Sequence, residues 1–187
     1  MTEKEKMLAG EPYYALDPQL LSELNAMKDM VWEYNSLRPS MRAEREAMLR
    51  RVIGSLGSDP LIVQPFYCDY GSNMCLGDRF FANFGFTVLD EARVSIGHNA
   101  FIGPNVGIYT ACHPTDAAER NRYIEWARPV SIGDNVWIGG GVTICPGVSI
   151  GHNVTIGAGS VVVHDIPDNC VAVGNPARVV RHLPAQG

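Results

Sequence analysis

The chain has 187 residues, of which 46% are hydrophobic and 19% charged, and its formal net charge is −5. This length suits one domain with a small appendage, and an acidic chain without a block of like charges is not expected to bind nucleic acid. No apolar stretch approaches the ~20 residues of a membrane span, and the N-terminus lacks the apolar core of a signal peptide, so we expect no membrane partner and a cytoplasmic location.

Residues 1–57 are predicted to form an N-terminal helical segment. Asp17 and Pro18 supply a helix N-cap and a proline at the first helical position. Apolar side chains then recur at spacings of three and four, as on an amphipathic helix: Leu20, Leu24, Met27, Val31 and Tyr34. A second helix is predicted after the break at Pro39, and Gly54 and Gly57 end it.

Residues 58–187 are predicted to form a second unit, which starts irregularly. Apolar residues already step by six there, which places the first coil near Ile62: Leu76, Ala82, Val88 and Val94. Aromatic residues are too numerous in this stretch to be corner residues alone: Phe66, Tyr67, Tyr70, Phe80, Phe81, Phe84 and Phe86. We expect most of them in the core or in a subunit contact, and some could line a pocket.

From Arg93 to Val163 the chain repeats every six residues. A branched aliphatic residue recurs on this period: Ile132, Ile138, Ile144, Ile150, Ile156 and Val162. An α-helix, with 3.6 residues per turn, cannot keep such a period on one face, whereas short strands joined by corners can. Three hexapeptides would make one coil of about 18 residues. The predicted fold class is therefore mainly β, a left-handed parallel β-helix with an N-terminal helical segment and a projecting loop.

A loop is predicted at residues 109–129, because Ile108 and Ile132 lie 24 residues apart instead of six. Long loops in compact repeat folds are usually functional or disordered. This loop contains His113, whereas His98 and His152 follow Ile-Gly at corners, where we expect exposed turn residues. After Pro167 the period fades into a segment that should cap the end of the solenoid.

His113 is the strongest candidate for chemistry, because a neutral imidazole can accept a hydroxyl proton near neutral pH. Three rival chemistries are weaker. A zinc centre on this fold would use histidines five residues apart, and no such pair occurs. Cys112 as a nucleophile would point away from His113 in an extended segment, and the GxSxG motif of a serine hydrolase is absent. The five cysteines lack CxxC spacing and are expected to be free thiols.

A second candidate site lies toward the C-terminus. Arg178 and Arg181 are three residues apart, and paired guanidinium groups suit phosphate oxygens. Small residues at 139–141 and 157–159 would leave a groove without side chains. Together these features indicate an extended, phosphate-bearing cofactor.

The chain resembles the maltose and galactoside O-acetyltransferases of the hexapeptide-repeat superfamily. The matching segments cover nearly the whole chain: MLAGEPYYALDPQL, QPFYCDYGSN, FFANFGFTVLD, IGPNVGIYTACHP, RPVSIGDNVWIGGGVTICPGVSIG, TIGAGSVV and VGNPARVVR. The resemblance implies an acetyl-CoA-dependent transferase that acetylates a hydroxyl, the 6-OH, of a sugar such as maltose, glucose or a galactoside. It also implies direct attack in a ternary complex, no metal, and a homotrimer with active sites between subunits.

The resemblance also implies residue roles. His113 would be the base, Glu125 would orient it, and the backbone N–H of Gly140 would meet the oxyanion. The residues implied to hold the acceptor are Asp17, Asp69, Asn83, Glu91 and Trp137. The residues implied to hold coenzyme A are Gly140, Ala158, Val163, His164, Arg178 and Arg181, although Val163 and His164 stand where the galactoside enzyme has a Thr-Lys pair.

Two alternatives stay open on the sequence. The acceptor could be an antibiotic or an amino sugar rather than a sugar hydroxyl, because the pocket and not the fold sets that choice. The chain could also be a non-catalytic solenoid that acts as a binding module or scaffold.

Overall fold

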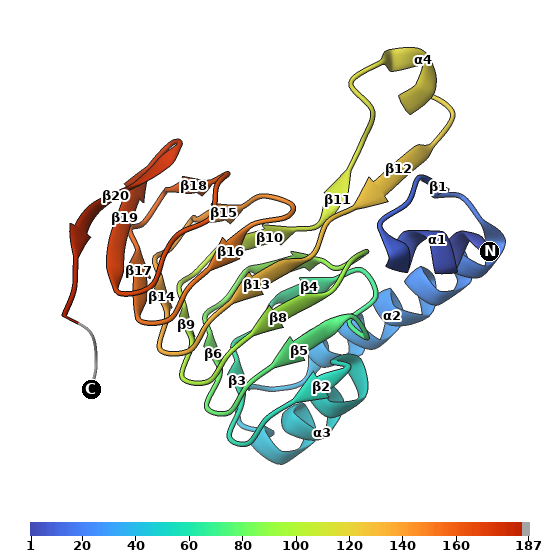
Figure 1. The fold of residues 1–187 in the computed structure, drawn as a ribbon. Helices are drawn as coiled ribbons and strands as arrows, with labels where there is room; N and C mark the ends of the chain where they lie inside the picture. Colours follow the sequence, from blue (N-terminus) through green and yellow to red (C-terminus); the bar gives the residue numbers. More distant parts are fainter. Residues whose placement is uncertain (185–187) are drawn as a thin grey trace.

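Most of the chain winds into a solenoid of short parallel strands with three flat faces (Figure 1). The computed structural model describes residues 1–184. Face I consists of β2 (Ser55–Leu56), β5 (Met74–Leu76), β8 (Val94–Ile96), β13 (Val130–Ile132) and β16 (Ser149–Ile150). Face II consists of β3 (Leu61–Ile62), β6 (Phe81–Ala82), β9 (Phe101–Ile102), β14 (Trp137–Ile138), β17 (Val154–Ile156), β19 (Cys170–Gly174) and β20 (Ala177–His182). Face III consists of β4 (Phe66–Cys68), β7 (Phe86–Leu89), β10 (Gly107–Tyr109), β15 (Thr143–Ile144) and β18 (Val161–Val162).

The six-residue period predicted from the sequence is the step from one face to the next. Ile132, Ile138 and Ile144 lie on faces I, II and III in turn, and each is at most 4% exposed. Each coil repeats this layer, so that Ile132 is in register with Ile150 and Ile138 with Ile156. Stacked aliphatic side chains thus fill the interior, which confirms the mainly β solenoid; its handedness stays a prediction.

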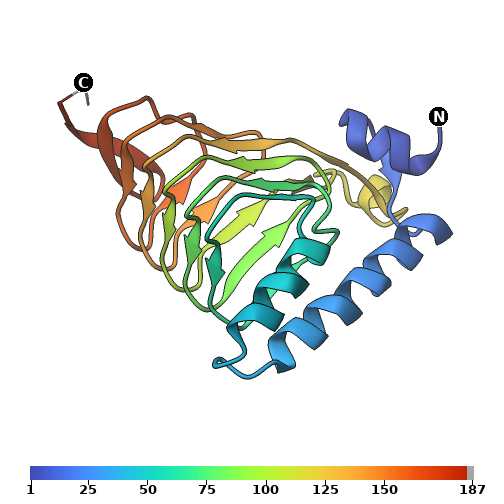
Figure 2. The same cartoon turned by 90° about the horizontal axis from the view of Figure 1, so that it is seen from below.

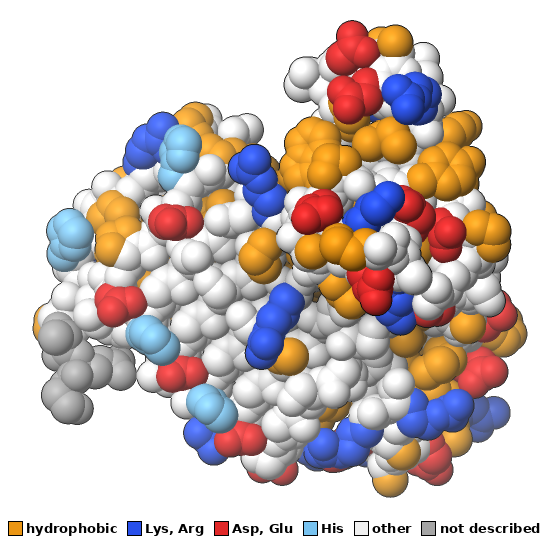
Figure 3. Space-filling view, turned by 45° about the vertical axis from the view of Figure 1, so that its right-hand side comes forward, with side chains coloured by type: hydrophobic (Ala, Val, Ile, Leu, Met, Phe, Trp, Pro, Cys, Tyr) orange, Lys and Arg blue, Asp and Glu red, His pale blue; other side chains and the backbone are white. Residues whose placement is uncertain are grey.

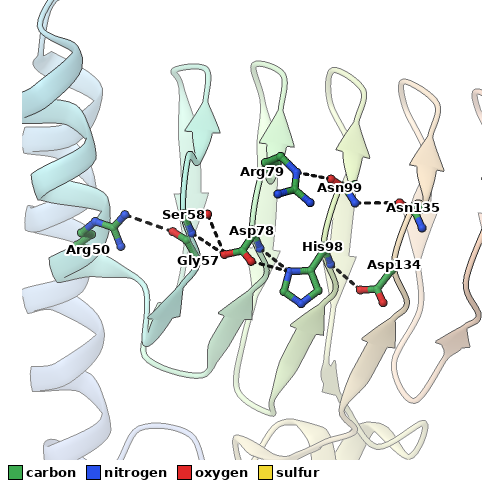
Figure 4. Close-up of polar contacts among 9 residues, drawn as sticks. All are labelled: Arg50, Gly57, Ser58, Asp78, Arg79, His98, Asn99, Asp134 and Asn135. Carbon is green, nitrogen blue, oxygen red and sulfur yellow. Dashed lines mark hydrogen bonds and ion pairs between the residues drawn. The ribbon is translucent and has the colours of Figure 1, made fainter.

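The corner between faces I and II is held by a ladder of side chains that accept backbone N–H groups of the preceding coil (Figure 4). The N–H of Asp78 donates to His98 Nδ1 at 3.0 Å, and the N–H of His98 donates to Asp134 Oδ1 at 2.7 Å. The N–H of Asp134 donates to His152 Nδ1 at 2.9 Å, which repeats the pattern in the next coil. The side chains of His98 and His152 are 53% and 61% exposed, as predicted for corner residues, and they also satisfy the turn.

Two helices, α2 (Pro18–Ser36) and α3 (Arg42–Val52), cover the N-terminal end of the solenoid (Figure 2). Helix α1 (Glu3–Ala9) packs against α2, β1 and β12 instead. Asp17 caps α2 as predicted, with Oδ1 accepting the N–H groups of Gln19 and Leu20. The solenoid begins at β2, one strand before the start predicted near Ile62, because Leu56 already pairs with Leu76. None of the helices within residues 1–184 is both long and apolar enough to cross a membrane.

The corner between faces III and I breaks the six-residue period. Cys68 and Leu76 occupy successive core positions but lie eight residues apart, and so do Val88 and Ile96. In the next coil this corner carries the whole 109–129 segment. The prediction of an unbroken step from Val88 to Val94 is therefore wrong, since Val94 is in register with Met74 and Val130.

Segment 109–129, predicted as a loop, forms an arm that projects from this corner. It consists of β11 (Ala111–Cys112) and β12 (Ile124–Ala127) as an antiparallel pair, with the short helix α4 (Ala117–Arg120) at the tip. The N-terminal strand β1 (Tyr13–Tyr14) adds to the outer edge of β12. Figure 3 shows the arm standing clear of the solenoid flank, with an open notch between them.

Candidate active site

The corner between faces III and I brings together four of the predicted site residues. Asp69 follows β4, Glu91 follows β7, and His113 and Glu125 lie on the arm that follows β10. The extra residues of three successive coils therefore stack at one place. The cluster forms because the six-residue period is broken at this corner. A regular six-residue step would not contain the additional residues.

His113 and Glu125 form a pair, and Tyr13 contacts the Glu125 carboxylate. Nδ1 of His113 lies 3.5 Å from Glu125 Oε2, and the hydroxyl of Tyr13 donates a hydrogen bond to Oε1 of the same carboxylate. Tyr13 is 1% exposed and the Glu125 side chain 13%, whereas the His113 side chain is 58% exposed. A carboxylate beside Nδ1 favours a proton there, which leaves the Nε2 lone pair free on the exposed side.

Glu91 lies deeper in the cluster and is only 7% exposed. Its burial and the neighbouring Asp69 carboxylate raise the pKa of Glu91 well above its usual range. The raised pKa favours the protonated form of the Glu91 carboxyl, which can donate a hydrogen bond to Asp69 or to a ligand. Thr110 supports it, with Oγ1 3.3 Å from Glu91 Oε2.

Asp90 fixes the backbone beside Asp69. Its Oδ1 accepts the N–H groups of Asp69 at 3.2 Å and Tyr70 at 2.8 Å, and the residue is fully buried. Burial raises the pKa of the Asp90 carboxyl. Asp90 therefore has a structural role, because its Oδ1 accepts hydrogen bonds from the backbone of this corner.

A cavity of about 420 Å³ opens beside the arm. It is lined by Ala15, His113, Arg120, Asn121, Tyr123 and Glu125. Asp17, the N-terminal residue predicted to reach the site, caps α2, and Ala15 lines the cavity instead. Tyr13 was not predicted as a site residue, because no local pattern links it to Glu125, which is 112 residues away.

A second groove, also of about 420 Å³, lies on face II and its corner with face III. It gathers four other predicted residues, which are Asn83, Trp137, Gly140 and Ala158, together with Phe81 and Phe101. Within residues 1–184, the N–H groups of Gly140 and Ala158 donate no hydrogen bond. These two amides are thus free to bind a ligand that lies along the groove.

Glycines keep this second groove open and bring its coils together. A Cβ on Gly139 would lie 2.6 Å from the backbone nitrogen of Ala158, and one on Gly103 would lie 2.6 Å from that of Gly140. No other residue allows the coils to approach so closely at this corner. The surface there is consequently formed by backbone, as the small-residue pattern predicted.

The remaining predicted residues lie at the C-terminal end. Arg178 and Arg181 are exposed on β20, which joins the sheet of face II through β19. Val163 and His164 are exposed after β18, at the corner between faces III and I. The two arginines therefore lie on the sheet of the second groove, and Val163 and His164 share a corner with the arm.

The arrangement suits proton abstraction better than the rival chemistries. Burial raises the pKa of the Cys112 thiol, which makes it a poor nucleophile at neutral pH. No group of three His, Cys, Asp or Glu side chains in residues 1–184 could hold a metal ion. His113, by contrast, has an oriented imidazole that faces an open cavity.

No residue lines both cavities of a single chain. The base and its carboxylates lie at the III–I corner, whereas the free amides and exposed aromatics lie on face II and the II–III corner. The two sets of predicted residues are therefore separated on the surface of one chain.

Comparison with known proteins gives matches over nearly the whole chain. Three family models match: a maltose acetyltransferase hexapeptide capping motif at residues 6–57, a hexapeptide repeat of succinyl-transferase at 93–111, and a bacterial transferase hexapeptide at 129–164. A putative acetyltransferase of Saccharomyces cerevisiae is 52% identical over 96% of this chain and 92% of its own length.

Two solved structures have the same fold. A maltose O-acetyltransferase from Clostridium difficile is 51% identical, with a TM-score of 0.98 and 99% of each chain covered. A galactoside acetyltransferase in complex with coenzyme A is 38% identical, with a TM-score of 0.95 over 98% of this chain and 92% of that one.

Proposed function

The chain belongs to the maltose and galactoside O-acetyltransferase family, and from this membership we propose that it transfers an acetyl group from acetyl-CoA to a primary hydroxyl of a sugar. Maltose, glucose and galactosides are the first acceptors to consider, with the 6-OH as the site of transfer. The observation that carries the proposal is the His113 imidazole, whose Nδ1 lies 3.5 Å from the partly buried Glu125 carboxylate and which faces an open cavity.

In the proposed mechanism His113 acts as general base. Nε2 takes the proton of the sugar hydroxyl as its oxygen attacks the carbonyl carbon of the thioester. The tetrahedral intermediate collapses with cleavage of the C–S bond, and the imidazolium returns its proton to the coenzyme A sulfur. Atoms balance without an acyl-enzyme, and Glu125 stabilises the transient positive charge on His113.

The oxyanion would be stabilised by the backbone amide of Gly140. This N–H has no acceptor among the described residues, so it needs no rearrangement to donate to the developing charge. The free N–H of Ala158 would bind the pantetheine arm of coenzyme A. Arg178 and Arg181 would bind its phosphates, and Val163 and His164 would add contacts from another subunit.

We propose a homotrimer with three active sites between subunits, since the two cavities must meet for catalysis. One subunit would supply His113, Glu125, Asp69 and Glu91, and its neighbour Asn83, Trp137, Gly140 and Ala158. Face II supports this assembly, because it exposes a row of large apolar side chains: Leu61 (37%), Phe101 (55%) and Trp137 (60%). Such rows usually mark interaction surfaces.

The acceptor would be held between the two halves of the site. Asp69 would accept hydrogen bonds from its hydroxyls, and the protonated Glu91 would donate one. Asn83 and Trp137 would close the site from the neighbouring subunit.

We also propose a cytoplasmic location, because acetyl-CoA is an intracellular metabolite and all five cysteines are free.

The proposal is tested by following thiol release from acetyl-CoA with a panel of acceptors: glucose, maltose, a β-galactoside, glucosamine and chloramphenicol. We expect release that depends on a sugar hydroxyl. Release with glucosamine but not glucose would indicate transfer to nitrogen, and release with chloramphenicol alone would indicate an antibiotic acceptor. Failure to bind coenzyme A by calorimetry would favour the scaffold alternative.

A further prediction concerns Tyr13, which acts through Glu125 as a positioning residue. Tyr13→Phe removes the one hydroxyl that binds Glu125 Oε1 among residues 1–184 and leaves this partly buried carboxylate oxygen without that donor. A hydrogen bond to a charged group is worth about 1.5–3 kcal/mol, so we expect kcat to fall at least ~10-fold while the KM for acetyl-CoA stays unchanged.

The matched control is Tyr14→Phe. Tyr14 is the next residue on β1, it is 41% exposed, and its hydroxyl makes no hydrogen bond within the described chain. This variant should keep wild-type kcat. Equal kcat values for the two variants would show that Tyr13 does not position the base.

A further inference from the structure

A third cavity, of about 410 Å³, lies between helix α2 and face III. Its floor is apolar and includes Val31 and Leu89. Trp32 from α2 and Tyr67 from β4 line it, with exposed fractions of 71% and 51%. A cavity of this size with aromatic walls is typical of a small-molecule site.

The position of α2 against β4 is fixed, so the cavity is a preformed feature. The Asn35 amide donates to the carbonyl of Phe66 at 2.8 Å and accepts the N–H of Phe66 at 2.9 Å. The Asn35 side chain thus pairs with both backbone groups of Phe66, as a neighbouring β-strand would, and this attaches helix α2 to β4. The distance between the two walls is therefore set by the fold.

The polar groups of both aromatic side chains, Trp32 and Tyr67, have no hydrogen-bond partner among the described residues. Within residues 1–184, neither the indole N–H of Trp32 nor the hydroxyl of Tyr67 makes a hydrogen bond. A flat ring with an unused polar group suits a ligand that has an apolar face and polar edges. A sugar ring has this character, with C–H groups on its faces and hydroxyls around its rim.

Asp69, which belongs to the proposed acceptor site, also lines this cavity. This residue is paired with Lys28 at 3.5 Å and interacts with Glu91 on its other side. Asp69, Glu91 and the arm follow β4, β7 and β10, which pair in register on face III. We therefore expect a ligand with one ring at His113 to reach this cavity past Asp69.

We infer that this cavity binds the second sugar ring of an acceptor whose first ring is acetylated at His113. The inference rests on the proposed function and deepens it, because it makes a disaccharide or longer saccharide a better acceptor than a monosaccharide. Trp32 and Tyr67 stack on the second ring, and Lys28 binds its hydroxyls.

The test compares kcat/KM for glucose, maltose and maltotriose in the wild type, in Trp32→Ala and in the control Leu8→Ala. Leu8 is a 52% exposed side chain on α1, outside all the cavities described here. We expect Trp32→Ala to lower kcat/KM for maltose and maltotriose roughly tenfold and to change that for glucose less than twofold. Leu8→Ala should change none of the three values.

Two further measurements separate this inference from the proposed function. Titration of maltose without acetyl-CoA should change the tryptophan fluorescence of the wild type more than that of Trp32→Ala, in which Trp137 is still present, whether or not any sugar is acetylated. An equal effect of Trp32→Ala on glucose and maltose, or no effect on either, would overturn the inference and leave the proposed function intact. Dissociation of the assembly by Trp32→Ala in sedimentation would also overturn it, since the cavity would then be a subunit contact.

Discussion

His113→Ala is expected to lower kcat for sugar acetylation by about 10³-fold, within the 10²–10⁴-fold range for loss of a general base. The imidazole is the only titratable group of the arm cavity that Glu125 orients, so no neighbour can take its place. The dissociation constant for coenzyme A should not change, because the proposed coenzyme groove lies on face II. Steady-state thiol release and calorimetry measure the two quantities separately.

His98→Ala is the matched control for this prediction. His98 is exposed to a similar degree, 53% against 58% for His113, but it lies at the corner between faces I and II. Its loss should leave kcat unchanged at a temperature well below unfolding. Retention of wild-type activity by His113→Ala would show that another group is the base.

Trimers that contain both of two inactive variants are expected to regain about one third of wild-type activity. His113→Ala lacks the base, and Ala158→Trp fills the coenzyme groove, so each alone should be nearly inactive. If the base comes from one subunit and the groove from its neighbour, about one site in three of each mixed trimer receives an intact copy of both. Co-expression with two different tags, followed by purification on both, gives the mixed population.

The control for the mixing experiment is His113→Ala combined with the double variant His113→Ala/Ala158→Trp. No mixed trimer of that pair contains His113, and activity should stay at the level of the single variant. A mixture of the two single variants that shows only the sum of their separate activities would place each site within one chain. The shared-site model would then be wrong.

The fold was predictable because a strict period leaves few structural solutions. An aliphatic residue every six positions can be buried only if the chain turns at each step, and the observed register from Ile132 to Ile150 is that repeat. The early coils were less clear, because two additional residues at one corner shift the period from Cys68 to Leu76 and again from Val88 to Ile96. Sequence spacing alone does not show that these interruptions stack on the arm.

The site was predictable only in part. His113 stood out because it lies in an insertion, and the resemblance supplied Glu125, which the structure places 3.5 Å from it. The separation of the predicted residues into two cavities depends on which corner each one occupies, and that needs the coil register. Tyr13 reaches Glu125 because β1 pairs with β12, a long-range contact without any local sequence signal.

The N-terminal contribution to the acceptor site stays a prediction. Asp17 is the nearest acidic candidate, and its Oδ1 accepts two N–H groups at the start of α2. In the single chain, Ala15 is the residue of this segment that lines the arm cavity. Sequence spacing alone does not show which N-terminal residue reaches the acceptor.

The most direct test of the account is to measure sugar ester and free thiol together in one reaction with acetyl-CoA labelled with ¹³C in the acetyl group. The account predicts one acetyl ester on a sugar oxygen for each thiol released, no thiol release without sugar, and neither product above background in His113→Ala. Acetyl transfer to the protein before sugar is added, or thiol release without a sugar ester, would contradict direct transfer from coenzyme A to the sugar hydroxyl.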